Sequence, residues 1–107
     1  MRRGDLVPVA LPGAYGKPRP ALIIQSDFFD EHPSVTVVPI TSELRDLPLV
    51  RLRVLPSEQN GLHKPSDLML DKLHTTPRDK IGLPFGHLER TYLTELERLL
   101  TVFLGLA

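Results

Sequence analysis

The segment Gly16-Lys17-Pro18-Arg19-Pro20 places an arginine between two prolines, directly before the most apolar stretch of the chain. Each proline fixes its own backbone dihedral φ and restricts the preceding residue to extended geometry. The backbone of Arg19 is therefore pre-set, and its planar guanidinium can present itself reproducibly to a phosphate group. The alternative is an edge-strand arginine paired with Asp27 or Asp5, and the segment alone favours neither.

Two further groups of polar side chains follow predicted strands. Thr41 and Ser42 end the segment 39–42, and their hydroxyls can donate hydrogen bonds to a phosphate oxygen. Asp71, Lys72 and His74 bring charge and an imidazole to the end of another strand, where they can line a groove. In both groups the alternative is an ordinary solvated strand end, which the residues alone slightly favour.

Metal and cofactor chemistry have little support in the sequence. The chain has no cysteine, which excludes disulfides, thiolate metal sites and cysteine nucleophiles. The loop 13–17 lacks the hydroxyl residue and the following helix of a nucleotide-binding P-loop. We therefore expect no metal and no cofactor, because no recognised ligand spacing connects the four histidines, His32, His63, His74 and His87.

Eleven prolines determine which elements can hold these side chains. A proline inside a helix costs about 3 kcal/mol or more, so a long helix is improbable before Pro84. The apolar run 21–24 is typical of a central strand covered on both faces, and Asn60-Gly61 is the strongest hairpin signal. Strands are expected over Asp5–Leu11, Arg19–Gln25, Ser34–Ile40, Leu49–Leu55 and Asp67–Leu73.

The proline-free end of the chain predicts a helix that starts near Glu89 or Thr91 and stops at Gly105. Its apolar residues recur at helical spacing and form one face. That face either covers the sheet or forms a dimer, and periodicity does not separate the two. The residues of the face are Leu93, Leu96, Leu99, Leu100, Phe103 and Leu104.

Length and composition indicate one mainly β domain over residues 1–107 with a C-terminal helix. The formal net charge is zero, with 13 basic and 13 acidic residues, which argues against a polybasic protein but not against a local basic groove. Apolar runs reach only about four residues, so no membrane span is expected. The start of the chain has no apolar signal region, and we expect a cytoplasmic protein.

Three blocks, taken in order, carry a resemblance that extends over nearly the whole chain. Arg3-Gly4-Asp5 and the segment 17–27 form the first block, 38–42 the second, and 70–75 with 80–82 the third. Together with the Leu-rich terminal helix, they resemble the MazF/PemK (Kid) family of toxin endoribonucleases. Each motif is short, but their order and spacing together are specific.

The resemblance implies an SH3-like small barrel that forms a homodimer and cleaves single-stranded RNA without a metal. It also implies a cognate antitoxin that neutralises the toxin. By position, Arg19 matches the family's catalytic arginine and Thr41 its catalytic threonine. Residues expected to bind the substrate are Lys17, Gln25, Ser42, Asp71, Lys72 and His74.

The residues suit this reaction. RNA supplies its own nucleophile, the 2′-OH, so the enzyme must assist proton transfer and stabilise charge on the phosphate. Arg19 fits charge stabilisation better than proton transfer, since a guanidinium keeps its proton. His74 is an alternative proton carrier. The expected products are a 2′,3′-cyclic phosphate and a 5′-OH end.

The chain also departs from the family pattern. The loop Pro12–Pro18 is short for one that can gate the RNA groove, Lys72 stands where a glutamine is common, and His74 where an arginine or lysine is common. Two other readings stay open. A CcdB-like gyrase poison is one, although such toxins rely on a C-terminal tryptophan and this chain has none. A non-catalytic SH3-like module that acts in operon autoregulation is the other.

Overall fold

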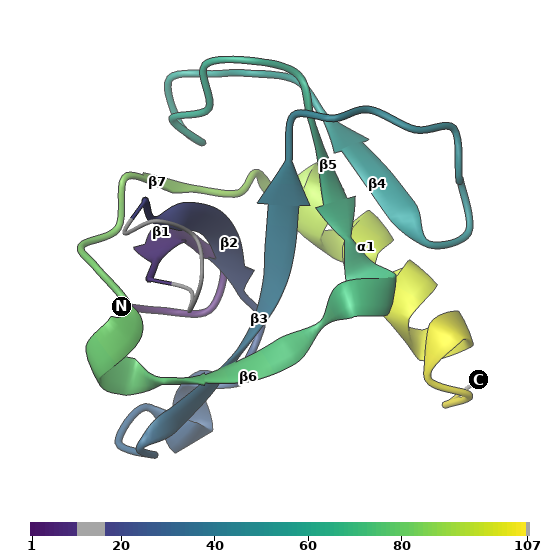
Figure 1. Cartoon of the computed structure of the whole chain (residues 1–107). Helices are drawn as coiled ribbons and strands as arrows, with labels where there is room; N and C mark the ends of the chain where they lie inside the picture. Colours follow the sequence, from purple (N-terminus) through teal and green to yellow (C-terminus); the bar gives the residue numbers. More distant parts are fainter. Residues whose placement is uncertain (11–16, 107) are drawn as a thin grey trace.

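The computed structural model describes residues 1–10 and 17–106 (Figure 1). These residues contain a single α-helix, α1 (Arg90–Phe103), near the C-terminus. Three one-turn 3₁₀ helices lie between strands: η1 (Asp27–Phe29), η2 (Leu70–Lys72) and η3 (Arg78–Lys80). The strands are β1 (Asp5–Val9), β2 (Arg19–Ile23), β3 (Ser34–Thr41), β4 (Arg51–Val54), β5 (Ser66–Met69), β6 (His74–Pro77) and β7 (Gly86–His87).

One bent antiparallel sheet contains these strands, in the order β4-β5-β3-β2-β1-β7. The long strand β3 organises it, because β2 lies along one edge while β6 and β5 share the other edge (Figure 1). β6 pairs with the first half of β3, and β5 pairs with its last two residues. The predicted class, mainly β with a C-terminal helix, is confirmed.

The core has two layers, one on each face of the central strands. Leu6, Leu22 and Val38 are aligned across β1, β2 and β3 and pack with α1 and η2. Val7 and Ala21, one position along, belong to a second cluster on the opposite face. The prediction that β2 is a central strand covered on both faces is confirmed, because alternate residues of β2 are buried in different clusters.

The helix α1 ends as the sequence predicts. Gly105 has a φ of 72°, its N–H bonds the Val102 carbonyl, and the Leu106 N–H bonds the Thr101 carbonyl, which is a Schellman motif. The predicted apolar face is only partly covered. Leu96, Leu99 and Leu100 are buried, whereas Phe103 and Leu104 in the last turn remain exposed. No helix in the described residues is long and apolar enough to cross a membrane.

Several predicted strand boundaries are wrong. β2 ends at Ile23 instead of Gln25, and β4 spans only Arg51–Val54. The strand expected over Asp67–Leu73 ends at Met69, because η2 turns the chain before β6 begins. β6 and β7 were not predicted, since neither shows alternating apolar residues; β3 and β1 supply their hydrogen-bonding partners. The expected end of the first strand, Leu11, lies outside the described residues.

Asn60-Gly61 does not form a two-residue hairpin, because residues 55–65 separate β4 from β5. Asn60 is instead fully buried, and its side chain bonds the Ser57 N–H, the Leu55 carbonyl and the Glu89 carboxylate. A Cβ on Gly86 would lie 2.0 Å from the Asn60 carbonyl oxygen. Asn60 thus packs the 55–65 loop against β7, the strand that precedes α1.

Candidate active site

An open pocket of about 460 Å³ lies where β2, the end of β3 and the 61–64 loop meet. The first residue of β2 and the last residue of β3 bring Arg19 and Thr41 to it, and Ser42 follows directly. Three of the residues predicted to act in catalysis or binding therefore share one pocket. Its other lining residues are Pro20, Ile40, Gly61, Leu62, His63, Lys64, Ser66 and Phe85.

Arg19 is exposed at the pocket, and no side-chain hydrogen bond or ion pair connects it to the rest of the described chain. The alternative pairing with Asp27 or Asp5 is wrong. Asp27 pairs with Arg2, and Asp5 accepts from the Arg2 N–H and contacts the His87 ring. Within residues 1–10 and 17–106 the guanidinium donors of Arg19 are therefore unused.

The Thr41 hydroxyl is half-buried, and its Oγ1 accepts a hydrogen bond from the Glu43 N–H at 3.1 Å. A hydroxyl has one proton to donate and two lone pairs that accept. Since an N–H already occupies one lone pair, the Thr41 proton is left for another acceptor. A phosphate oxygen in the pocket is such an acceptor.

Four further side chains of the pocket were missed from the sequence. His63, Lys64 and Ser66 follow the Asn60-Gly61 turn, and Phe85 lies against that turn. The turn is interpreted in the sequence only as a hairpin signal and His63 only as a possible metal ligand, so neither His63 nor Lys64 is predicted at this site. Two adjacent cationic or imidazole side chains beside a left-handed glycine are a signal that could have indicated them.

The remaining predicted substrate-binding residues lie outside the lining of this pocket. Lys17 is exposed just before β2, and Asp71 and Lys72 are exposed on η2. The Gln25 amide bonds the Ser34 carbonyl and the Thr36 N–H, so it closes the loop between β2 and β3. His74 opens β6 opposite Val37, and its Nδ1 lies 3.2 Å from the Lys72 carbonyl.

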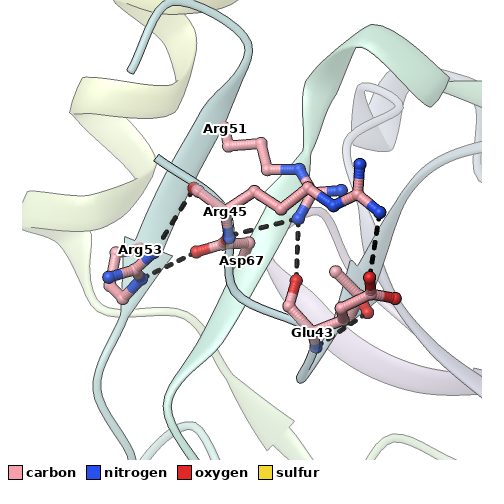
Figure 2. A network of polar contacts seen from close by, with 6 residues as sticks. Glu43, Arg45, Arg51, Arg53 and Asp67 are labelled. Carbon is pink, nitrogen blue, oxygen red and sulfur yellow. Dashed lines mark hydrogen bonds and ion pairs between the residues drawn. The ribbon is translucent and has the colours of Figure 1, made fainter. Parts of the chain in front are cut away.

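A network of charges flanks the pocket where β5 pairs with the end of β3 (Figure 2). Asp67 is 1% exposed, and its carboxylate accepts from Arg53 at 2.9 Å, from the Arg45 N–H at 2.9 Å and from Arg51 at 3.3 Å. Burial raises the pKa of Asp67, but these hydrogen bonds outweigh burial and hold the pKa below its ordinary value. Asp67 is thus a stable anion at neutral pH.

No group of three histidine or acidic residues that could hold a metal ion occurs within residues 1–10 and 17–106. The predicted gating loop, Pro12–Pro18, lies largely outside the described residues. The site as described combines cations, hydroxyls and an imidazole with the apolar side chains of Pro20, Ile40, Leu62 and Phe85 around an open pocket.

A bent half-barrel with a terminal helix, whose pocket brings Arg19 together with the hydroxyls of Thr41 and Ser42, defines a small β protein with donors suited to an anion. The chain belongs to the PemK-like, MazF-like toxins of type II toxin–antitoxin systems, whose family model matches residues 2–104. It is also 50% identical, over 108 residues, to a probable endoribonuclease MazF of Mycolicibacterium smegmatis, covering 100% of this chain and 99% of that protein. The chain is therefore an enzyme of the MazF endoribonuclease family.

Solved structures agree with this assignment. The Mycobacterium tuberculosis toxin MazF-mt6 superposes with a TM-score of 0.80 at 27% identity, covering 94% of this chain and 96% of that chain. A mycobacterial endoribonuclease in complex with its cognate antitoxin has a TM-score of 0.84 at 22% identity, covering 100% and 97%. The predicted toxin fold is confirmed.

Proposed function

We propose that this toxin cleaves single-stranded RNA at short sequence motifs without a metal ion, and thereby inhibits translation and growth. The 2′-OH attacks the adjacent phosphorus and the 5′-oxygen leaves, giving 2′,3′-cyclic phosphate and 5′-OH ends. The observation that carries this proposal is the convergence of Arg19, Thr41 and Ser42 on one open pocket. A reaction whose nucleophile belongs to the substrate needs only proton transfer and charge stabilisation from the protein.

In this proposal Arg19 stabilises the charge that develops on the phosphate, through charge-assisted hydrogen bonds. Thr41 donates its free proton to a second phosphate oxygen, and Ser42 and Lys64 bind the same or a neighbouring phosphate. His63 lines the pocket whereas His74 does not, so His63 is the better proton carrier. Lys17, Gln25, Asp71, Lys72 and His74 have no place in this chemistry and would act, if at all, on RNA beyond the pocket.

The partners are part of the same proposal. A mycobacterial endoribonuclease of this fold is solved with its cognate antitoxin, which supports a cognate antitoxin for this chain. Exposed apolar side chains at the end of α1, Val102, Phe103, Leu104 and Leu106, support a homodimer. We place the protein in the cytoplasm, where mRNA is available, and treat residues 1–107 as one domain.

The test is cleavage of a mixed-sequence RNA by purified protein in excess EDTA, with mapping of 5′ ends. Discrete cuts with 5′-OH ends are expected, and Arg19→Ala should lower the rate about 10²–10³-fold, as losing one preorganised donor does. Arg98→Ala is the matched control, because Arg98 is an exposed arginine on α1 that lies outside the pocket and, among the described residues, bonds only Glu95. Absence of cleavage by folded protein, or equal loss in both variants, would overturn the proposal.

A further inference from the structure

A short chain of contacts connects Thr41 to Asp67, its register partner on β5. Thr41 Oγ1 accepts from the Glu43 N–H at 3.1 Å, and the Glu43 carbonyl accepts from Arg51 Nη1 at 2.8 Å. The same Nη1 lies 3.3 Å from Asp67 Oδ2, and the Arg45 N–H donates to that oxygen at 2.9 Å (Figure 2). The turn after β3 is thus held at two points by one carboxylate.

Burial makes this anchor stiff. The side chains of Asp67 and Arg51 are 1% and 9% exposed, so neither is free to exchange its partner for water. Removing one member of a buried ion pair leaves the other charge unpaired, which is strongly destabilising locally. By contrast, the nearby side chains of Glu43 and Arg45 are 72% and 60% exposed. Ion pairs as exposed as this one contribute little to stability.

Burying the charged side chain of Asp67 within β5 costs desolvation free energy, which its hydrogen-bond partners must offset. Its neighbours in sequence, Ser66 and Leu68, are also buried, and one of its two oxygens pairs with Arg53, its register partner on β4. Every side-chain hydrogen bond of Asp67 in the described residues goes to Arg45, Arg51 or Arg53, which lie in the segment that follows Thr41. The Oδ1 atom therefore supports the β4–β5 pairing, whereas Oδ2 holds the turn that follows Thr41.

We propose that Asp67 is a positioning residue for Thr41: it anchors the turn that occupies one Thr41 lone pair and leaves the hydroxyl proton for the substrate phosphate. The inference rests on the proposed role of Thr41 in the reaction. Preorganised donors that need no rearrangement during the reaction contribute most to catalysis. Loss of the anchor should thus lower kcat more than it raises KM.

The experiment is a double-mutant cycle on kcat at saturating RNA, with Asp67→Asn, Thr41→Val and both together. Asp67→Asn should lower kcat about tenfold while KM changes less than about twofold. In the Thr41→Val background the same substitution should have no further effect, because the hydroxyl it positions is gone. Arg45→Met is the matched control: it removes a charge from the same turn but keeps the backbone N–H, and kcat should change less than about twofold.

Arg51→Met provides a second route if Asp67→Asn fails to fold, since it removes the contact with the Glu43 carbonyl and should give the same non-additive loss. Circular dichroism and thermal unfolding establish that each variant is folded. Additive losses in the cycle, or a normal kcat in folded Asp67→Asn or Arg51→Met, would overturn the inference. Full activity of Thr41→Val would instead overturn the proposed role of Thr41, so the two failures are distinguishable.

Discussion

At the scale of single residues, the site depends on which side chains stay unsatisfied. Arg19 has no side-chain partner in the described residues, because Asp5 and Asp27 lie toward the other end of the β1–β2 pair, where they contact His87 and Arg2. Thr41 Oγ1 accepts from the Glu43 N–H, and in the described residues its own proton has no acceptor. Gln25 shows the opposite case, since both ends of its amide are used within the chain. Residue type alone does not separate these cases.

His63 and His74, the two histidines considered as proton carriers, provide a test at this scale. His63 lines the pocket and His74 does not. We expect His63→Gln to lower kcat about 10²-fold, as the loss of a general acid or base does, and His74→Gln to change it less than about twofold. Single-turnover cleavage rates of the two variants at one pH check this ranking. The reverse ranking would move proton transfer to His74.

At the scale of elements, close packing of the 55–65 loop against the segment before α1 fixes the side of the pocket formed by Gly61 and Phe85. Gly61 has a φ of 70°, and a Cβ there would lie 2.4 Å from the Phe85 carbonyl oxygen. Gly86 approaches Asn60 even more closely. Phe85 lines the pocket between these two contacts, so its ring is placed by backbone packing on both sides.

This close packing predicts different costs for two glycine substitutions. Gly86→Ala must displace the Asn60 backbone and should lower the free energy of unfolding by at least about 3 kcal/mol. Gly105→Ala meets nothing within 4 Å but stays at a φ of 72°, so only the left-handed backbone opposes it, at about 1 kcal/mol. Urea unfolding of both variants measures the difference. Equal costs would mean that the loop yields at Asn60 without penalty.

At the scale of the whole molecule, a formally neutral chain must bind a polyanion through a local set of cations. Arg19 and Lys64 line the pocket, while Arg51 and Arg53 are already paired with Asp67. Most of the thirteen basic residues therefore do not face the pocket. The molecule is expected to recognise RNA without strong long-range attraction.

Salt dependence tests this expectation. For an RNA that lacks the 2′-OH at the cleaved nucleotide, two phosphate contacts predict a slope of about −1.4 for log affinity against log salt concentration. Lys64→Met should halve that slope, and Lys80→Met, a change of an exposed residue outside the pocket, should leave it unchanged. A slope of −4 or steeper would show that the RNA contacts a much wider basic surface.

Local physics was enough to predict much of the fold. Proline spacing, the apolar run 21–24 and the helical periodicity before Gly105 predicted the central strand, the terminal helix and its end correctly, because each depends on backbone geometry and burial of neighbouring residues. The resemblance of ordered short motifs indicated the family. The roles of Arg19 and Thr41 remain predictions from that resemblance.

Only the tertiary structure decided which residues meet. β6 and β7 exist because distant strands supply their hydrogen bonds, and nothing in their own sequence requires a strand. The pocket adds His63, Lys64 and Phe85, and leaves Gln25, Asp71 and His74 outside, because loop packing around Asn60 and not spacing along the chain sets these distances. The sequence by itself determined the central strand, the terminal helix and the family, because these depend on local backbone geometry and burial; long-range pairing decided the remaining strands and the site.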